Sequence, residues 1–208
     1  MATRRAPGRP RGRPAKTRQE IVEAGAGVFR RLGYHQARMD DVAAALGLSK
    51  GSLYYYVHTK EDLLFEIVLP PYREAIAHLT EVAASDLPVP ARLEEVIRRH
   101  LSNVVKHYPA ISIYLESHRH LPVPEEMRQL DREYSARLRQ IVIDGMRDGS
   151  LRIQDPATAV AALVGMCNWF AIRYEPAGGW DPVEVAAGFA AIFLEGLVVP
   201  HPERRPRG

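Results

Sequence analysis

The sequence predicts an all-α protein, and three observations support this. Apolar residues recur at helical spacings of three and four through most of the 208 residues. Asp155-Pro156 and Asp181-Pro182 each place an N-cap residue before a proline at the first helical position. Residues 38–64 have the pattern of two short helices joined by a tight turn. A chain of this length can form one large domain or two small ones.

The first helix is expected between residues 17 and 32. Ile21, Val28 and Phe29 share one face of it, and Gly33 follows at its end. Since this face is apolar, we expect the helix to support the two short helices that follow.

The turn between the two short helices has a recognisable chemistry. Val42, Ala43 and Leu46 lie on one face of the first helix, and Gly47 follows where a helix end can become left-handed. Ser49 can then cap the second helix by accepting a hydrogen bond from an exposed backbone N–H.

The second short helix is predicted to bury Leu53 and Val57 and to turn its other face outward. That outward face carries hydrogen-bond donors and flat aromatic rings but no acidic residue. Such a surface suits the major groove of DNA and the phosphates beside it.

Three stretches of this segment, residues 41–43, 46–54 and 59–64, resemble the helix-turn-helix of the TetR family of transcriptional repressors. The resemblance implies an N-terminal three-helix DNA-binding domain, a C-terminal helical effector-binding and dimerisation domain, and release from DNA when a ligand binds. The alternative is an αα-hairpin packed inside an unrelated helical bundle. We expect Lys50, Ser52 and Tyr55 to reach base edges. The other DNA-binding candidates, for phosphates, capping or close backbone approach, are Arg38, Ser49, Gly51, Tyr54, Tyr56 and Lys60.

Charge is distributed unevenly along the chain. Residues 1–60 hold 12 Lys and Arg against 4 Asp and Glu, whereas residues 61–199 hold 13 against 20. A basic N-terminal part on an acidic body is typical of a protein that presents one end to a polyanion.

Residues 1–16 are rich in Pro, Gly and Arg, and we expect a disordered arm. Residues 8–14 resemble the core of an AT-hook, in which an extended Arg-Gly-Arg lies along a narrow minor groove. Arg9, Arg11 and Arg13 are therefore candidate DNA contacts. The alternative is a solvated basic tail without groove preference.

The start of the next long helix is marked by Thr59 and Asp62, which have the spacing of a capping box. Pro70 and Pro71 then interrupt the helical pattern, so we expect a kink or a break there. A hinge within one helix and a boundary between two helices both remain open. Arg38 precedes the earlier helix at 39 without a capping side chain, so the cap is expected either to be lost or to be supplied by Asp40 or Asp41.

The rest of the chain predicts helices at residues 91–107, 109–119, 125–147, 156–175 and 182–198. The last two are apolar nearly all round, which indicates burial on two sides and hence a partner subunit. The family resemblance likewise implies a four-helix dimer interface built from these two helices. The interface candidates are Val160, Val164, Phe189, Ile192 and Phe193. The expected organisation is therefore an arm (1–16), a DNA-binding domain (17–62), an effector and dimerisation domain (63–199) and a disordered tail (200–208).

Residues 165–169 and 174–178 resemble the equivalent stretches of the TetR branch that responds to acyl-coenzyme A thioesters. We therefore expect a cavity among the body helices that holds a hydrophobic effector with an anionic or polar end. A cationic drug would need buried carboxylates, and Glu116 keeps that alternative open. The expected lining is Ile97, His100, Leu101, Val104, His118, Met127, Leu130, Tyr134, Met166, Asn168, Trp169 and Arg173.

Other classes of function find little support in the sequence. The single cysteine, Cys167, fits a reducing compartment, and with no long apolar run or secretory leader the protein is expected to be cytoplasmic. No phosphate loop, GxSxG or HExxH motif occurs, and the histidines lack partners at metal-ligand spacing. We therefore expect no catalytic residues, no metal and no cofactor.

The sequence as a whole predicts a homodimeric, ligand-responsive repressor that binds a palindromic double-stranded operator and is released by an acyl-coenzyme A-like effector. A drug-responsive repressor of an efflux gene is the first alternative. An architectural binder of AT-rich DNA and a ligand-binding enzyme or carrier are more remote alternatives.

Overall fold

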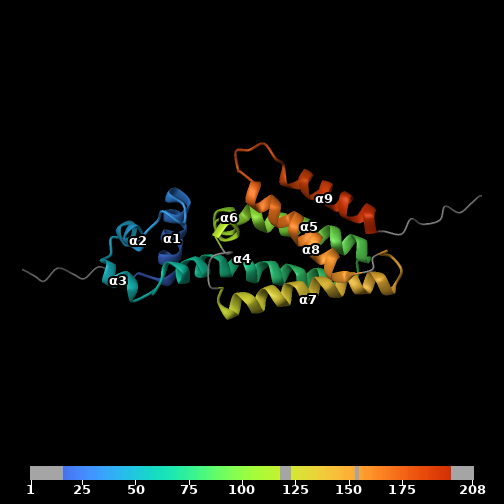
Figure 1. The fold of residues 1–208 in the computed structure, drawn as a ribbon, viewed down its shortest axis with the longest axis horizontal. Helices are drawn as coiled ribbons and strands as arrows, with labels where there is room; N and C mark the ends of the chain where they lie inside the picture. The colour runs from blue at the N-terminus through green and yellow to red at the C-terminus, as the bar shows by residue number, and fades with distance from the viewer. Residues whose placement is uncertain (1–15, 118–122, 153–154, 198–208) are drawn as a thin grey trace, which may run out of the picture.

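The protein folds into a small helical head and a larger helical body, connected by one long helix (Figure 1). The structure is a computed structural model that describes residues 16–117, 123–152 and 155–197. Within these residues every regular element is a helix, which confirms the all-α prediction. The head contains α1 (Arg18–Leu32), α2 (Met39–Leu46) and α3 (Lys50–Tyr54). The body contains α5 (Val89–Lys106), α6 (Tyr108–Ser117), α7 (Glu125–Arg147), α8 (Pro156–Arg173) and α9 (Pro182–Leu197).

The turns of the head form where local sequence predicts them. Gly33 and Gly47, which follow α1 and α2, have φ values of 76° and 64°, a region that strongly favours glycine. Ser49 caps α3, because its hydroxyl accepts a hydrogen bond from the Ser52 amide at 3.1 Å. These three predictions are confirmed.

The start of α2 lacks a capping side chain from its N-cap residue. Arg38 occupies that position, and a guanidinium has no acceptor with which to bind the first amides of the helix. The Asp41 carboxylate accepts a hydrogen bond from the Arg38 backbone N–H at 2.8 Å, which is only the reciprocal half of a capping box. Of the two alternatives, the side-chain cap on the first helix amides is therefore lost, and neither Asp40 nor Asp41 supplies it.

Helix α4 runs without a break from Lys60 to Ala83 and includes both Pro70 and Pro71. Of the two alternatives left open at the prolines, a boundary between two helices is therefore excluded. A proline inside a helix costs about 3 kcal/mol or more in isolation, so other contacts must compensate. Packing supplies them, because α4 buries residues in the head cluster before the prolines and Leu79 and Val82 in the body cluster after them. Its residues in the head cluster are Leu63, Leu64, Phe65, Ile67 and Val68. The domain boundary expected at residues 62–63 lies inside this continuous helix.

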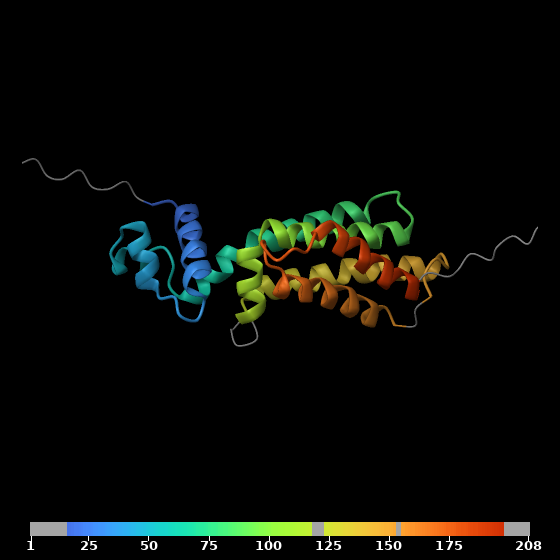
Figure 2. The same ribbon diagram turned by 90° about the horizontal axis from the view of Figure 1, so that it is seen from above.

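The body is a bundle in which α4 packs against α5, α6 and α7, and α8 packs against α5, α6 and α7 (Figure 2). Helix α9 lies at one edge, where it packs against α5. The apolar cores of head and body are not separate at α6 and α7, because Tyr114 and Met127 belong to the same buried cluster as the head. The head therefore rests on the body as well as being tethered to it.

The close packing of α1 on α4 gives a test of the fold. A Cβ at Gly25 would lie 2.7 Å from Leu63 Cδ2, whereas a Cβ at Gly27 on the same helix would meet nothing within 4 Å. We expect Gly25→Ala to destabilise the protein by about 1–3 kcal/mol through overpacking. Gly27→Ala should instead stabilise it by about 0.5–1 kcal/mol, because alanine has the higher helix propensity. Thermal unfolding of the two variants measures the difference, and shifts of equal sign would contradict this packing.

Candidate DNA interface and ligand cavity

Helix α3 presents a polar and aromatic surface at the outer end of the head. Leu53 and Val57 are fully buried and anchor it. Around them Lys50, Ser52 and Tyr55 are exposed, and the Tyr55 ring is 83 % exposed without support from the core. A side chain of this size that is left open at a helix surface is suited to contact with a partner.

The remaining candidate contacts of α3 vary in exposure. Tyr54 is exposed, whereas Tyr56 is half-buried, with its ring edge-to-face on Tyr55 at a centroid distance of 5.5 Å. Gly51 has open space where a Cβ would be, so the backbone can be approached closely there. The Ser49 hydroxyl lies 2.8 Å from that of Ser52, so Ser49 acts first as a cap and second as a donor.

Lys50, at the start of α3, is held by an acid from α2. Its ammonium lies 3.1 Å from a carboxylate oxygen of Asp40, and both side chains are exposed. An exposed pair of this kind contributes at most about 1 kcal/mol, so a phosphate or a base edge can displace it. Asp40 therefore orients Lys50, a role that the sequence did not suggest.

Lys60 lies differently from what its sequence position suggests. Its ammonium donates to the carbonyls of Ala37 at 2.8 Å and His35 at 3.3 Å, and it sits 4.4 Å above the ring of Tyr34. Desolvation lowers the pKa of this lysine. The charge is thus used to fix the turn between α1 and α2, which leaves little of it for a phosphate.

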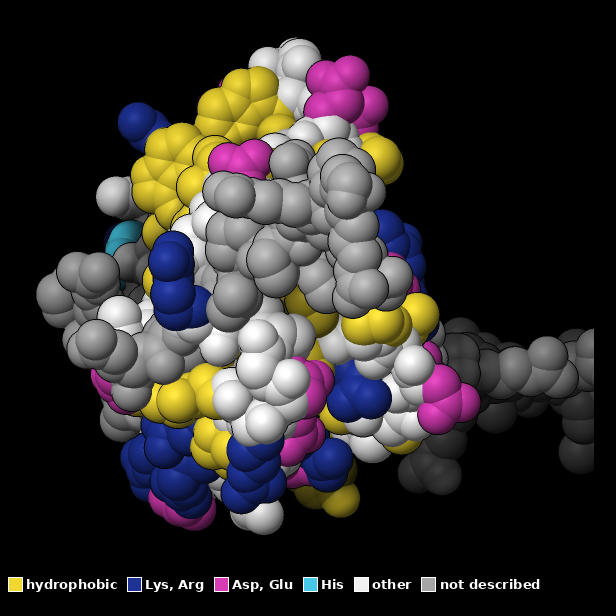
Figure 3. All heavy atoms as spheres, turned by 90° about the vertical axis from the view of Figure 1, so that its right-hand side faces the viewer, with side chains coloured by type: hydrophobic (Ala, Val, Ile, Leu, Met, Phe, Trp, Pro, Cys, Tyr) yellow, Lys and Arg dark blue, Asp and Glu magenta, His cyan; other side chains and the backbone are white. Residues whose placement is uncertain are grey.

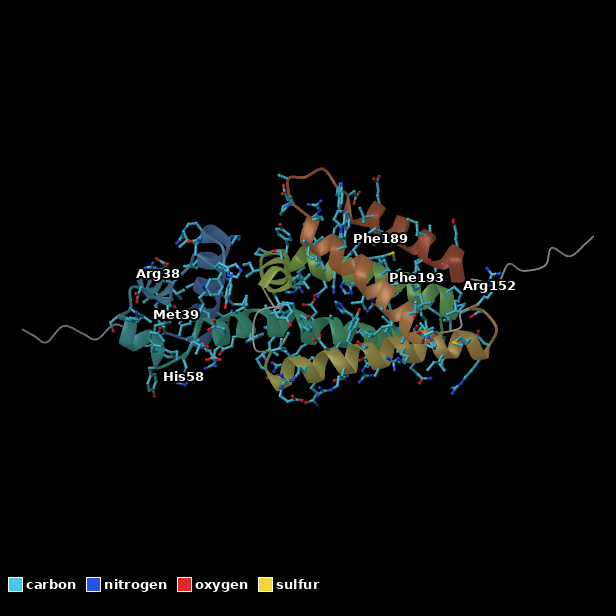
Figure 4. The ribbon with its side chains drawn as sticks, viewed as in Figure 1. Arg38, Met39, His58, Arg152, Phe189 and Phe193 are labelled. Atoms are coloured by element: carbon cyan, nitrogen blue, oxygen red, sulfur yellow. The ribbon has the colours of Figure 1, made fainter. Side chains whose placement is uncertain are left out.

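Two further cationic or titratable side chains lie on the outside of the head (Figure 4). Arg38, a predicted contact, is exposed beside buried Met39. His58, which was not predicted as a contact, is exposed in the turn before α4. Arg9, Arg11 and Arg13 lie outside the described residues.

A cavity of about 240 Å³ lies inside the body. Its wall comes from α4, α5, α6, α7 and α8, and it is mixed in character, with apolar side chains, three tyrosines and several neutral polar groups. The residues that line it are Pro71, Tyr72, Ala75, His100, Asn103, Val104, Ile111, Tyr114, Leu115, Asp131, Tyr134, Ser135, Val164 and Asn168. This composition is typical of a site for a small organic molecule.

The polar groups at one side of the cavity form a small network. His100 Nδ1 and the Tyr134 hydroxyl are 3.0 Å apart. Desolvation lowers the pKa of His100 to about 4, although a hydrogen bond with Asn168 acts in the opposite direction. Burial also raises the pKa of Tyr134. All three groups are therefore uncharged at neutral pH, and this side of the cavity offers hydrogen bonds without a cation.

Comparison with known proteins agrees with this division into head and body. A family model described as "Bacterial regulatory proteins, tetR family" matches residues 21–67. A second model, "Tetracyclin repressor-like, C-terminal domain", matches residues 86–197, more than half of the chain. This chain belongs to the TetR family. It is therefore a TetR-type transcriptional repressor, and its head is the family's helix-turn-helix.

Similar proteins extend over most of the chain. The HTH-type transcriptional repressor KstR2 of Rhodococcus jostii is 27 % identical over 188 residues, covering 88 % of this chain and 92 % of its own. The crystal structure of the TetR family regulator PfmR from Thermus thermophilus matches with a TM-score of 0.76 and 29 % identity, over 85 % of this chain and 97 % of that one. AibR, solved in complex with isovaleryl coenzyme A and operator DNA, has a TM-score of 0.72 at 23 % identity, over 85 % and 98 % of the two chains. At that identity the likeness to AibR shows the fold alone.

Four of the predicted effector contacts of this TetR protein line the cavity, namely His100, Val104, Tyr134 and Asn168. The others lie elsewhere. Ile97 and Leu101 are buried core residues of the body, Met127 and Leu130 belong to the head cluster, and Met166 packs against the body core. His118 lies outside the described residues.

Trp169 and Arg173 lie outside the cavity because of their phase on α8. The Trp169 indole is 50 % exposed and stacks on Trp180, with ring centroids 5.7 Å apart. Arg173 lines a separate surface hollow with Glu175 and Trp180. Asn168 faces the cavity, and one residue further along a helix points about 100° away.

Several cavity residues were not predicted from the sequence, chiefly Tyr72, Asn103 and Asp131. One helical face carries residues at the spacing i, i+3, i+4, here Asp131, Tyr134 and Ser135. Since Tyr134 was a predicted contact, this spacing could have indicated that Asp131 lies on the same side of the helix. Asp131 is therefore an acid in the cavity wall that the sequence analysis did not name beside Glu116. The side chain of Glu116, the other acid considered, lies outside the described residues.

Most of the predicted dimer contacts are occupied within one subunit. Val160 and Phe193 are buried in the body core, Phe189 packs against it, and Val164 lines the cavity. Figure 4 labels Phe189 and Phe193 on the body. Ile192 alone among the five is open, with 70 % of its surface exposed. The apolar surface that remains on α8, α9 and the loop between them consists of Trp169, Ile172, Trp180, Val183 and Ile192. An end view shows hydrophobic side chains open on this side of the body (Figure 3).

Two negative results apply to the described part of the chain. No group of three or more His, Cys, Asp or Glu is placed to hold a metal ion there. No helix in the described ranges is long and apolar enough to cross a membrane.

Cys167 is buried, and burial raises the pKa of its thiol to about 12, which makes it a core residue and not a nucleophile.

The contrast between Lys50 and Lys60 can be tested with matched variants. Lys50→Met should weaken operator binding by about 1–3 kcal/mol and relax the preference at one base pair, which operators changed at single positions will reveal. Lys60→Met should instead lower the melting temperature, because the carbonyls of His35 and Ala37 lose their shared donor. Fluorescence anisotropy at several salt concentrations and thermal unfolding separate the two effects. A salt slope that changes only in the Lys60 variant would contradict this assignment.

Proposed function

We propose that this TetR repressor is a homodimer on a palindromic operator and leaves it when an acyl-coenzyme A thioester binds to the body. The observation that carries the proposal is the cavity of about 240 Å³ in the body. Its wall includes Pro71, Tyr72 and Ala75 of α4, the helix that begins in the DNA-binding head. A ligand in the cavity therefore touches the element on which the head is mounted.

The lining suits the acyl part of such an effector. Val104, Ile111, Leu115 and Val164 supply apolar surface, and the neutral network around His100 supplies polar points near it. AibR, of the same fold, binds isovaleryl coenzyme A, and this supports the ligand class. No Lys or Arg lines the cavity among the described residues, so the phosphates of the coenzyme would lie outside it.

Asp131 favours a second candidate, a lipophilic cation. It is the acid among the described lining residues. Burial raises the pKa of Tyr72 and Tyr114, and the charge of Asp131 raises it further. A carboxylate next to three tyrosine rings is a suitable environment for a cationic drug. The alternative function is then a drug-responsive repressor of an efflux gene.

Release from DNA requires that the effector bind one arrangement of the head more tightly than the other. Equal affinity for both arrangements would shift no population. Because α4 is continuous, a displacement of Tyr72 or Ala75 is transmitted along the helix toward Lys60 at its start. Pro70 and Pro71 remove two backbone hydrogen bonds from α4 and are the proposed place of bending.

The dimer is proposed to form through the exposed apolar surface of α8 and α9. Its operator would be a palindrome with half-site centres about 34–36 Å apart or a multiple of that distance. We expect Ile192→Glu to shift the sedimentation coefficient from dimer to monomer and to weaken operator binding. Leu87→Glu, an equally polar change at an exposed residue between α4 and α5, is the control and should remain dimeric.

Phe193→Glu is unsuitable for this test, because Phe193 is buried in its own subunit and the charge would disrupt folding. A folded Ile192→Glu variant that sediments as an undisturbed dimer would exclude this surface as the interface. Deleting residues 1–15 gives a separate check. A repressor should keep its operator site without the arm, whereas an architectural AT-rich binder should lose DNA binding.

The effector class is tested by operator release and thermal shift with acyl-coenzyme A esters, free fatty acids and lipophilic cations. We expect the thioesters to release the DNA, and Tyr134→Phe to weaken this because His100 loses its hydroxyl partner. Asp131→Asn is the matched variant for the alternative, since it should abolish a response to cations and spare one to thioesters. Release by cations alone would exclude the thioester and assign this repressor to efflux control.

A further inference from the structure

We infer that Asn103 is an effector-recognition residue, which accepts a hydrogen bond from a hydroxyl or amide N–H of the ligand while it holds α4 at Pro71. The inference rests on the proposed function in that it takes the cavity as the effector site. It adds the chemical feature that the ligand carries, namely a neutral hydrogen-bond donor within the part that enters the body. Nothing in the sequence pattern indicated a role for this residue.

The orientation of the Asn103 amide is fixed by its partner on α4. Asn103 Nδ2 lies 3.2 Å from the carbonyl oxygen of Pro71. A carbonyl can only accept, so the NH₂ group must be the one that faces Pro71, and an exchanged amide would place two oxygens against each other. Oδ1 is therefore directed away from α4.

Oδ1 has no hydrogen-bond partner among residues 16–117, 123–152 and 155–197, and it is buried. An unsatisfied buried acceptor costs about 1–3 kcal/mol, so such groups are few in folded proteins and each needs an explanation. The residue is 6 % exposed and lies in the wall of the cavity between Pro71, Val104 and His100. A leucine of similar size would fill the same space without this cost. The free energy lost at Oδ1 would be regained if a bound ligand donated a hydrogen bond to it.

The donor must be small and uncharged. Oδ1 is covered by neighbouring atoms, so a ligand reaches it only when the side chains around it shift, and a single hydroxyl or N–H needs the smallest shift. An ammonium group would find a stronger partner in Asp131, which lines the same cavity. His100 and Tyr134 are already 3.0 Å from each other and can satisfy one another without the ligand. Asn103 therefore differs from these two residues, because its acceptor Oδ1 still lacks a hydrogen-bond donor among the described residues.

The position of Asn103 also explains how recognition reaches the DNA-binding head. The Asn103 amide is a single planar group, with Nδ2 bonded to the Pro71 carbonyl of α4 and Oδ1 available to the ligand. Any rotation of the amide toward a ligand changes the bond to Pro71. Occupancy of the cavity is then coupled to α4 at the place where that helix lacks its own backbone donors.

The test compares ligands that differ in one donor. Isothermal titration of the full-length protein with 3-hydroxyoctanoyl- and octanoyl-coenzyme A should show about tenfold tighter binding of the hydroxylated ester, the effect of one hydrogen bond to a buried acceptor. Asn103→Leu should reduce this ratio to about one. Ser102→Ala, which removes a polar side chain from the exposed face of the same helix, should keep it.

Thermal shifts with 1-octanol and 1-chlorooctane repeat the comparison without the coenzyme. If neither thioester binds but 1-octanol stabilises the wild type more than 1-chlorooctane, and Asn103→Leu removes the difference, the thioester proposal fails and the Asn103 assignment stands. Should Asn103→Leu not fold, Asn103→Asp provides the second variant. It keeps the acceptor and should retain or increase the preference for the donor while lowering the melting temperature through loss of the bond to Pro71. Equal affinity of the wild type for each pair, or an unchanged preference in Asn103→Leu, would overturn the inference.

Discussion

The architecture depends on α4 as one continuous helix from the DNA-binding head through the body. It remains helical through two consecutive prolines because both of its ends are buried. Leu79 and Val82 pack among body residues, and at the other end Leu63, Leu64, Phe65, Ile67 and Val68 pack among head residues. The segment around the prolines is then free to serve the cavity, to which it contributes Pro71, Tyr72 and Ala75. Stability and ligand contact are thus assigned to different stretches of the same helix.

The DNA-binding head and the body differ in how their charged side chains are paired. On α3 the charge of Lys50 is exposed and only weakly held by Asp40, so it can be transferred to DNA. In the body, acids and bases pair on the surface, as in Glu95 with Arg98 and Arg99, whose guanidiniums lower the pKa of the carboxyl to about 2. The cavity keeps neutral groups beside Asp131, so the nature of its ligand is decided by hydrogen bonding and by one carboxylate.

Features that depend on neighbours in sequence were predictable, and features that depend on distant neighbours were not. The caps at Ser49 and Thr59, the left-handed Gly47 and the buried pair Leu53 and Val57 follow from spacings of three or four. The exposed side of the last two helices could not be predicted in this way. An apolar helix without a polar face does not indicate which of its sides is turned to solvent. Contact with α5 determines that phase and buries Phe193 while exposing Ile192.

The same reason explains the residues that were misplaced or missed. Lys60 finds its carbonyl partners 23 and 25 residues earlier in the chain, and Asn103 finds Pro71 32 residues earlier. Trp169 is adjacent to Asn168 in sequence but lies on another side of α8. Family resemblance located the cavity among the right helices, and only the packing of those helices decided which side chains face it.

The shared cluster of Tyr114, Met127 and the head residues has a consequence for folding. A head cut away at residue 62 would lose Leu63, Leu64 and Phe65 and would expose the surface that rests on α6. The helix-turn-helix therefore cannot be a separate folding unit, and head and body should unfold in a single cooperative transition. A head transplanted onto another body would therefore have to carry the first turns of α4 with it in order to stay folded.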